Sequence, residues 1–142
     1  MPSVGIRPYV VYGPGRDQGM TSGPTLAMAA AARGERFEIG YGGTAQYDYA
    51  PDVGRAFVRA ASWSGGAVVA NFPGERAAMS DVVAAIEAAA PEATGTITWD
   101  EATSLPFPPE LESHALEAAL GPVPRTPLAA GVAETIARFR AA

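Results

Sequence analysis

The residues most able to do chemistry stand in two short groups. Tyr12 precedes a Gly13-Pro14-Gly15 turn, which is followed by Arg16 and Asp17, and a second group is Tyr47-Asp48-Tyr49. Tyrosine hydroxyls and carboxylates exchange protons, and a guanidinium binds anions through its planar fork. Both groups are candidates for lining a substrate site. The structural alternatives are a plain β-turn, a solvated loop pair and an ordinary sheet face.

Arg7 and Asp52 are the other charged candidates. Arg7 could hold a carboxylate or a phosphate, or it could form a buried ion pair with Asp48 or Asp52. Asp52 follows Pro51 and is better interpreted as a helix-start residue than as a catalyst, because a carboxylate in the first turn faces the positive end of the helix dipole.

Several site classes are excluded by the residue types. His114 is the only histidine and there is no cysteine, so neither a common zinc site nor a thiol nucleophile can be assembled. All ten basic residues are arginine. Gly40, Gly42 and Gly43 lack the spacing and the lysine of a phosphate loop. We therefore expect no metal site, and the candidate chemistry rests on Tyr, Asp and Arg.

The bulk composition indicates a single domain spanning residues 1–142. The net charge of −5 gives no basic surface for nucleic acid. No apolar run approaches the roughly 20 residues of a membrane span, and the start of the chain does not resemble a signal peptide. We expect a cytoplasmic protein that binds neither nucleic acid nor membrane.

The hydrophobic pattern predicts alternating strands and helices, and hence an α/β fold. The strand over residues 4–11 contains Pro8, which implies an edge, a bulge or a strand end there. The other expected strands are 36–39, 45–49, 67–72 and 96–99. Helices are expected after Thr21 or Ser22, from Pro51, after Ser80, over 110–120, and from a cap at Thr126 with Pro127 as first residue. The final helix carries Leu128, Val132, Ile136 and Phe139 on one face.

Three ordered segments resemble a known family. Arg7-Pro8 with Val11-Tyr12-Gly13-Pro14-Gly15 resembles the R-P-x-x-V-Y-G-P-G segment of extended short-chain dehydrogenase/reductases, the NAD-dependent epimerase/dehydratase family. Tyr47 to Phe57 is similar to the family's aromatic strand and D-V-x-R-A-F helix. Thr126-Pro127-Leu128 with Gly131 and Thr135 is similar to its closing T-P-L-x-x-G-x-x-x-T helix.

The resemblance implies the carboxyl-terminal half of such an enzyme. That half comprises the last strands of a Rossmann-type sheet and a small mixed α/β substrate-binding lobe. Only six residues precede Arg7, so the family's G-x-x-G-x-x-G turn is absent, and a chain without lysine has no Y-x-x-x-K pair. By resemblance, Pro8 contacts the cofactor. The implied substrate-binding residues are Tyr12, Gly13, Arg16, Asp17, Tyr47 and Tyr49.

Without the dinucleotide-binding half, we expect no cofactor on the isolated chain. We expect NAD(P) to bind only if a Rossmann half is supplied. An exposed edge of the first strand favours a homodimer or a partner chain that carries that half. Two alternatives remain open: a stand-alone binding protein without redox activity, and a cofactor-free cyclase or isomerase.

The implied substrate is a small hydroxyl or carbonyl compound and not a nucleotide sugar. By resemblance, the diphosphate of a nucleotide sugar is held by an Asn and an Arg, and alignment places Val10 and Ala45 at these positions. Neither side chain can form a charge-assisted contact. We expect a pocket lined by Val10, Tyr12, Ala45, Tyr47 and Tyr49.

Overall fold

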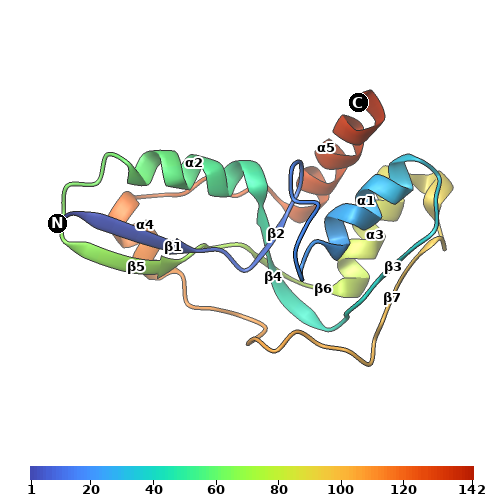
Figure 1. Cartoon of the computed structure of the whole chain (residues 1–142), viewed down its shortest axis with the longest axis horizontal. Helices are drawn as coiled ribbons and strands as arrows, with labels where there is room; N and C mark the ends of the chain where they lie inside the picture. Colours follow the sequence, from blue (N-terminus) through green and yellow to red (C-terminus); the bar gives the residue numbers. More distant parts are fainter.

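A computed structural model describes residues 1–142 and shows an elongated α/β molecule with two lobes (Figure 1). One lobe, on the left of Figure 1, contains a two-stranded sheet and two helices: β1 (Ser3–Arg7), β5 (Ala67–Asn71), α2 (Ala50–Ala60) and α4 (His114–Leu120). The other lobe contains α1 (Gly23–Ala32), β3 (Phe37–Ile39), α3 (Met79–Ala89), a short 3-10 turn (Pro91–Ala93), β7 (Ile97–Trp99) and α5 (Leu128–Ala141). Between the lobes lies a three-stranded sheet of β2 (Val10–Tyr12), β4 (Thr44–Tyr49) and β6 (Glu75–Ala78). This arrangement confirms the α/β fold class.

The strand predicted over residues 4–11 is broken at Pro8, as proline's missing N–H donor implied. β1 pairs in parallel with β5, and Arg7 lies opposite Asn71. β2 changes partner and pairs in parallel with β4, with Val10 opposite Tyr47. The first stretch of the chain therefore joins both sheets, and the joint lies at Pro8-Tyr9.

Strand β6 has no counterpart among the predicted elements. It pairs antiparallel with β4, with Thr44 opposite Ala78. Its sequence, Glu-Arg-Ala-Ala, lacks the β-branched residues that mark a strand, so its conformation follows from the pairing. The expected cap at Ser80 is wrong, because α3 begins at Met79, and the Asp81 carboxylate accepts the Ala78 backbone N–H at 3.0 Å.

The ends of three further helices can be compared with the prediction. Ser22 is the N-cap of α1, and Gly34 follows that helix with φ +71. The helix expected over 110–120 begins only at His114. α5 begins at Leu128, so Thr126 is not its cap; the Thr126 backbone N–H instead donates to Asp52 at 2.6 Å.

The apolar side chains form two separate cores. The larger comprises 22 buried residues, drawn chiefly from β2, β4 and helices α1, α3 and α5. It includes Leu128, Val132 and Ile136, which confirms the predicted face of the last helix. The smaller core lies between β1–β5 and helices α2 and α4, and its seven buried residues are Ile6, Val53, Ala56, Ala70, Phe72, Leu116 and Val123. The joint at Pro8 thus separates two packing units.

None of the helices combines the length and the hydropathy needed to cross a membrane.

Candidate functional site

The larger of two cavities beside the joint lies at the carboxyl ends of β1 and β5. Its volume is about 420 Å³. In open parallel sheets, ligands bind outside the carboxyl ends of the strands. Its lining comes from the ends of both strands and from the loop that precedes α4: Arg7, Pro8, Tyr9, Asn71, Phe107, Pro108 and Leu111. We take this cavity as the candidate site and call it the strand-end cavity.

Arg7 is the cation of the strand-end cavity, and it makes no ion pair. The expected pairing with Asp48 or Asp52 is wrong, because each carboxylate has other partners. Asp48 accepts the Tyr9 backbone N–H at 2.6 Å, and Asp52 pairs with Arg55 at 2.8 Å. The Arg7 side chain is exposed and keeps its guanidinium free to bind an anion.

The lining of the strand-end cavity includes two aromatic rings and a loop that is held by hydrogen bonds. The rings of Tyr9 and Phe107 meet edge to face, with centroids 5.7 Å apart and planes at 85°. The Gln46 side-chain oxygen accepts the Leu111 backbone N–H at 3.1 Å. The Asn71 amide donates to the Glu112 carbonyl at 2.7 Å. These two contacts fix the loop over the cavity.

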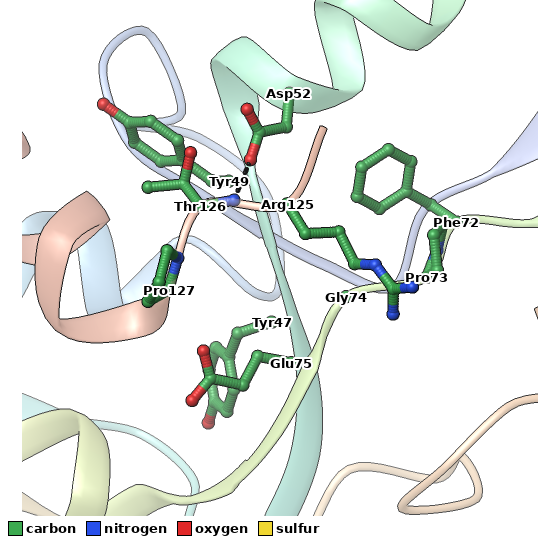
Figure 2. A pocket seen from close by; sticks show the side chains of 10 residues that line it. All are labelled: Tyr47, Tyr49, Asp52, Phe72, Pro73, Gly74, Glu75, Arg125, Thr126 and Pro127. Carbon is green, nitrogen blue, oxygen red and sulfur yellow. Dashed lines mark hydrogen bonds between the residues drawn. The ribbon is translucent and has the colours of Figure 1, made fainter. Parts of the chain in front are cut away.

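The second cavity, of about 240 Å³, is a seam between β4, the segment after β5, and the start of α5 (Figure 2). The two carboxylates in its lining already accept hydrogen bonds from backbone N–H groups. Asp52 accepts the Thr126 N–H, drawn dashed in Figure 2, and Glu75 accepts the Leu128 N–H at 2.7 Å. Arg125 pairs with Glu117 at 2.9 Å. Because these charges hold the 125–128 segment, this cavity is a structural seam.

The structure separates the six residues expected to bind substrate. Tyr47 and Tyr49 line the seam cavity. Tyr12 is buried in the larger core, and the Gly13 backbone N–H donates to Thr25 Oγ1 at 3.1 Å. Arg16 donates to Thr21 Oγ1 at 3.2 Å, and Asp17 lies exposed on the loop. Val10 and Ala45 are core residues as well, and neither of them lines either cavity.

The buried tyrosines cannot act as bases near neutral pH. Burial raises the pKa of Tyr12 and of Tyr47 well above the usual range. Their hydroxyl oxygens have no hydrogen-bond partner within the protein. Tyr12 and Tyr47 both pack in the larger core, and Tyr47 also lines the seam cavity.

Asp48 is a fully buried carboxyl group at the joint. Burial raises its pKa to about 7, although the Tyr9 N–H that it accepts acts in the opposite direction. Its second oxygen has no hydrogen-bond partner and lies against Gly74, where an added Cβ would stand 1.8 Å away. The hydrogen bond to Asp48 thus holds Tyr9 beside the strand-end cavity, and its cost is the burial of an ionisable carboxyl group.

Pro8 lies in the strand-end cavity, whereas Tyr9, Asn71 and Phe107 are site residues that the sequence reasoning missed. Asn71 had a usable signal, since it ends a parallel strand. Phe107 had none, because nothing in a proline-rich loop indicates which strand end it covers.

The two strands that end at the strand-end cavity do not form a pyrophosphate-binding turn. A pyrophosphate needs a glycine-rich turn that leads into a helix N-terminus. Here β1 ends in Arg7-Pro8 and β5 ends in Asn71-Phe72-Pro73, and neither strand leads directly into a helix. No group of three or more His, Cys, Asp or Glu side chains stands close enough to hold a metal ion.

Comparison with known proteins gives structural relatives only. No protein-family model matches the sequence, and no curated protein does. MoeE5, solved with UDP-glucuronic acid and NAD, is 26% identical with a TM-score of 0.75, over 97% of this chain and 47% of that chain. UDP-glucose 4-epimerase from Thermotoga maritima, solved with UDP-glucose, is 21% identical with a TM-score of 0.76, and the match covers 97% of this chain and 46% of the epimerase. A partial consensus L-threonine 3-dehydrogenase is 19% identical with a TM-score of 0.83, and the match covers 96% of this chain and 48% of the dehydrogenase.

The chain therefore spans about half the length of the solved structures it matches. It has the fold of one half of such epimerases and dehydrogenases, as the resemblance to the carboxyl-terminal half of extended short-chain dehydrogenase/reductases predicted.

Proposed function

We propose that this chain is the substrate-binding part of an NAD(P)-dependent oxidoreductase of the epimerase/dehydratase type. Its substrate is a small hydroxyl or carbonyl compound that carries a carboxylate. NAD(P) is bound by the half that this chain does not cover, with Pro8 as the contact from this side. A cytoplasmic location, expected from the sequence, belongs to the same proposal.

The observation that carries the proposal is the unpaired Arg7 in a largely apolar cavity. A guanidinium beside apolar walls binds a carboxylate through two parallel charge-assisted hydrogen bonds. Phe107, Pro108 and Leu111 supply apolar contact area for the rest of a small molecule. One cation matches one carboxylate, whereas a diphosphate carries more charge than Arg7 can balance.

The size of the cavity and its surroundings favour a small substrate. About 420 Å³ lies near the lower end of the roughly 300–1,000 Å³ typical of ligand pockets. Val10 and Ala45, which align with the diphosphate contacts of the resembling family, are 0% and 2% exposed. Neither position presents a polar group to a ligand.

Nucleotide sugars are the rival substrate class. MoeE5 and the Thermotoga maritima epimerase were solved with UDP-sugars bound. The L-threonine 3-dehydrogenase, named for a small amino acid, has the higher TM-score of 0.83. Similar folds thus serve both classes, and a binding experiment on this chain must decide between them.

The test is calorimetry on the purified chain with two sets of probes. L-Threonine and 3-hydroxybutyrate represent small hydroxy acids, and UDP-glucose and UDP-glucuronic acid represent nucleotide sugars. We expect saturable binding of at least one hydroxy acid, and no saturable binding of a UDP-sugar. Micromolar binding of a UDP-sugar that free UDP competes away would overturn the proposed substrate class.

Two arginine variants locate the binding. Arg7→Gln removes the cation from the cavity, and Arg36→Gln removes an exposed arginine that also lacks an ion pair but lies in the other lobe. A charge-assisted hydrogen bond contributes about 1.5–3 kcal/mol, so Arg7→Gln should weaken hydroxy-acid binding about ten- to a hundredfold. Arg36→Gln should leave it unchanged. Equal losses in both variants would refute the assignment of Arg7.

A further inference from the structure

The segment between β7 and α4 crosses from one lobe to the other and borders the strand-end cavity on its way (Figure 1). Near its start, Ser104 is held by a β-bridge to Gly42. Near its end, the Leu111 N–H donates to the Gln46 side chain at 3.1 Å. Both fixed points therefore lie on the same stretch of chain, in or just before β4. We call residues 105–110, which lie between them, the strap.

The fixed point at the end of the strap is itself held firmly. Gln46 is 4% exposed, and its amide group also donates to the carbonyls of Phe72 and Gly74, at 3.3 Å in each case. These two bonds fix the orientation of the Gln46 amide. A second contact follows directly along the chain, where Asn71 donates to the Glu112 carbonyl at 2.7 Å. The strap therefore ends at a point that β4 and the end of β5 hold together.

The strap itself makes no backbone hydrogen bond to the rest of the chain. Pro106, Pro108 and Pro109 have no N–H to donate, and their rings restrict φ to about −65°. Leu105 packs against the larger core, whereas residues 106–110 are exposed. The shape of the strap therefore depends on its two fixed ends, on three stiff proline residues and on contacts of its side chains.

Phe107 makes the contact between the strap and the wall of the cavity. Its ring meets the Tyr9 ring edge to face at 5.7 Å between centroids, yet Phe107 remains 46% exposed. Tyr9 is fixed, because its N–H donates to Asp48 and its hydroxyl oxygen is buried. Phe107 and Pro108 are the residues of the strap that line the cavity. A ligand in the cavity therefore meets the strap as one of its apolar boundaries.

We propose that the strap sets an upper limit on the length of the ligand, and that Phe107 is the residue that determines this specificity. The inference rests on the proposed function for the class of ligand, a hydroxy acid bound by Arg7, and adds the length of its carbon chain. A short acid fits between the strand ends and the Phe107 ring. A longer chain reaches that ring, and a strap that is fixed at both ends does not move outward to admit it.

The experiment is calorimetry with 3-hydroxybutyrate, 3-hydroxyhexanoate and 3-hydroxyoctanoate, which differ only in chain length. One methylene in an apolar pocket changes affinity about 10- to 200-fold. We expect the dissociation constant of the wild type to rise at least tenfold from the four-carbon to the eight-carbon acid. In Phe107→Ala, the eight-carbon acid should bind at least as tightly as the four-carbon acid, because the ring that limits the chain is gone.

Two further variants separate the position of Phe107 from its residue type. Phe57 is the matched control, because it is also a phenylalanine, is 49% exposed and lies on α2 outside the cavity. Phe57→Ala should keep the length dependence of the wild type. Phe107→Trp retains a large ring on the strap and should keep it as well. Loss of the length dependence in either variant, to the extent seen in Phe107→Ala, would overturn the role of Phe107.

Straight-chain alcohols from 1-butanol to 1-octanol distinguish this inference from the proposed function, because their binding needs no cation. The NMR resonances of the Tyr9 ring report their entry into the cavity. If hydroxy acids do not bind, but the wild type still rejects the longer alcohols and Phe107→Ala accepts them, the proposed function fails and the inference stands. An equal response of the wild type and Phe107→Ala to every member of both series, including no response, would overturn the inference.

Discussion

Replacing the buried Asp48 with asparagine should stabilise the protein at neutral and basic pH. The asparagine carbonyl can still accept the Tyr9 N–H, which Asp48 accepts at 2.6 Å. Asparagine carries no charge, however, and its second polar atom occupies the position of the oxygen that has no partner. The substitution therefore removes the cost of an ionised group in the core and keeps the contact that fastens the joint.

The size and sign of the effect follow from the pKa. Burial raises the pKa of Asp48 from 3.8 to about 7. Between about pH 4 and pH 7 the folded protein keeps a proton that the unfolded chain releases, so stability falls as the pH rises through this window. A shift of about 3 units at 1.36 kcal/mol each corresponds to about 4 kcal/mol above pH 7. Asp48→Asn should exceed the wild type by up to this amount at pH 8, and by about 1 kcal/mol or less at pH 4.5.

Urea unfolding, followed by the fluorescence of Trp63 and Trp99 from pH 4.5 to 8.5, measures this difference. Asp17→Asn is the matched control, because Asp17 is exposed on a loop, and its difference from the wild type should not change with pH. A difference between Asp48→Asn and the wild type that is constant over the whole range would refute the reasoning. So would a variant that is less stable than the wild type at pH 8.

Three further predictions concern the packing of Gly131, a hydrogen bond to Asp52, and the binding of NAD. Gly131→Ala places a Cβ 2.2 Å from the Tyr12 hydroxyl and should lower the free energy of unfolding, measured in urea, by about 1–3 kcal/mol. Because that hydroxyl has no hydrogen-bond partner, the double variant with Tyr12→Phe should recover most of the lost stability. Asp52→Ala removes the acceptor of the Thr126 N–H and should cost about 1–3 kcal/mol in the same assay, whereas unchanged stability would contradict the structural role of Asp52. The isolated chain should not bind NAD⁺ or NADH at micromolar concentration in calorimetry, and tight binding would show that the glycine turn is dispensable.

Local signals in the sequence predicted most elements of the fold. Pro8 predicted the break between β1 and β2 because it lacks a donor. The spacing of Leu128, Val132 and Ile136 predicted the buried face of α5. Strand β6 was missed because Glu75–Ala78 owes its conformation to pairing with β4. Local propensity carries no information about such a partner.

The candidate site was predictable only in outline. The Gly13-Pro14-Gly15 turn was a candidate for lining the site, but in the structure it packs against Tyr49: a Cβ on Gly13 would stand 3.1 Å from the Tyr49 ring. The free Arg7 could not be deduced, since the sequence offered Asp48 and Asp52 as partners at plausible positions. Only the fold shows that a backbone amide and Arg55 use these carboxylates. Phe107 lines the cavity from a loop, and no sequence motif indicates that position.

The most direct test of the proposed function is an NMR titration of the chain with 3-hydroxybutyrate and, separately, with UDP-glucose. If the strand-end cavity binds small hydroxy acids, 3-hydroxybutyrate will shift the Arg7 Nε–Hε resonance saturably and give intermolecular NOEs to the rings of Tyr9 and Phe107. UDP-glucose will do neither. An Arg7 resonance that responds to UDP-glucose and not to 3-hydroxybutyrate, or hydroxy-acid NOEs confined to Tyr47 and Tyr49 in the seam cavity, would contradict the account.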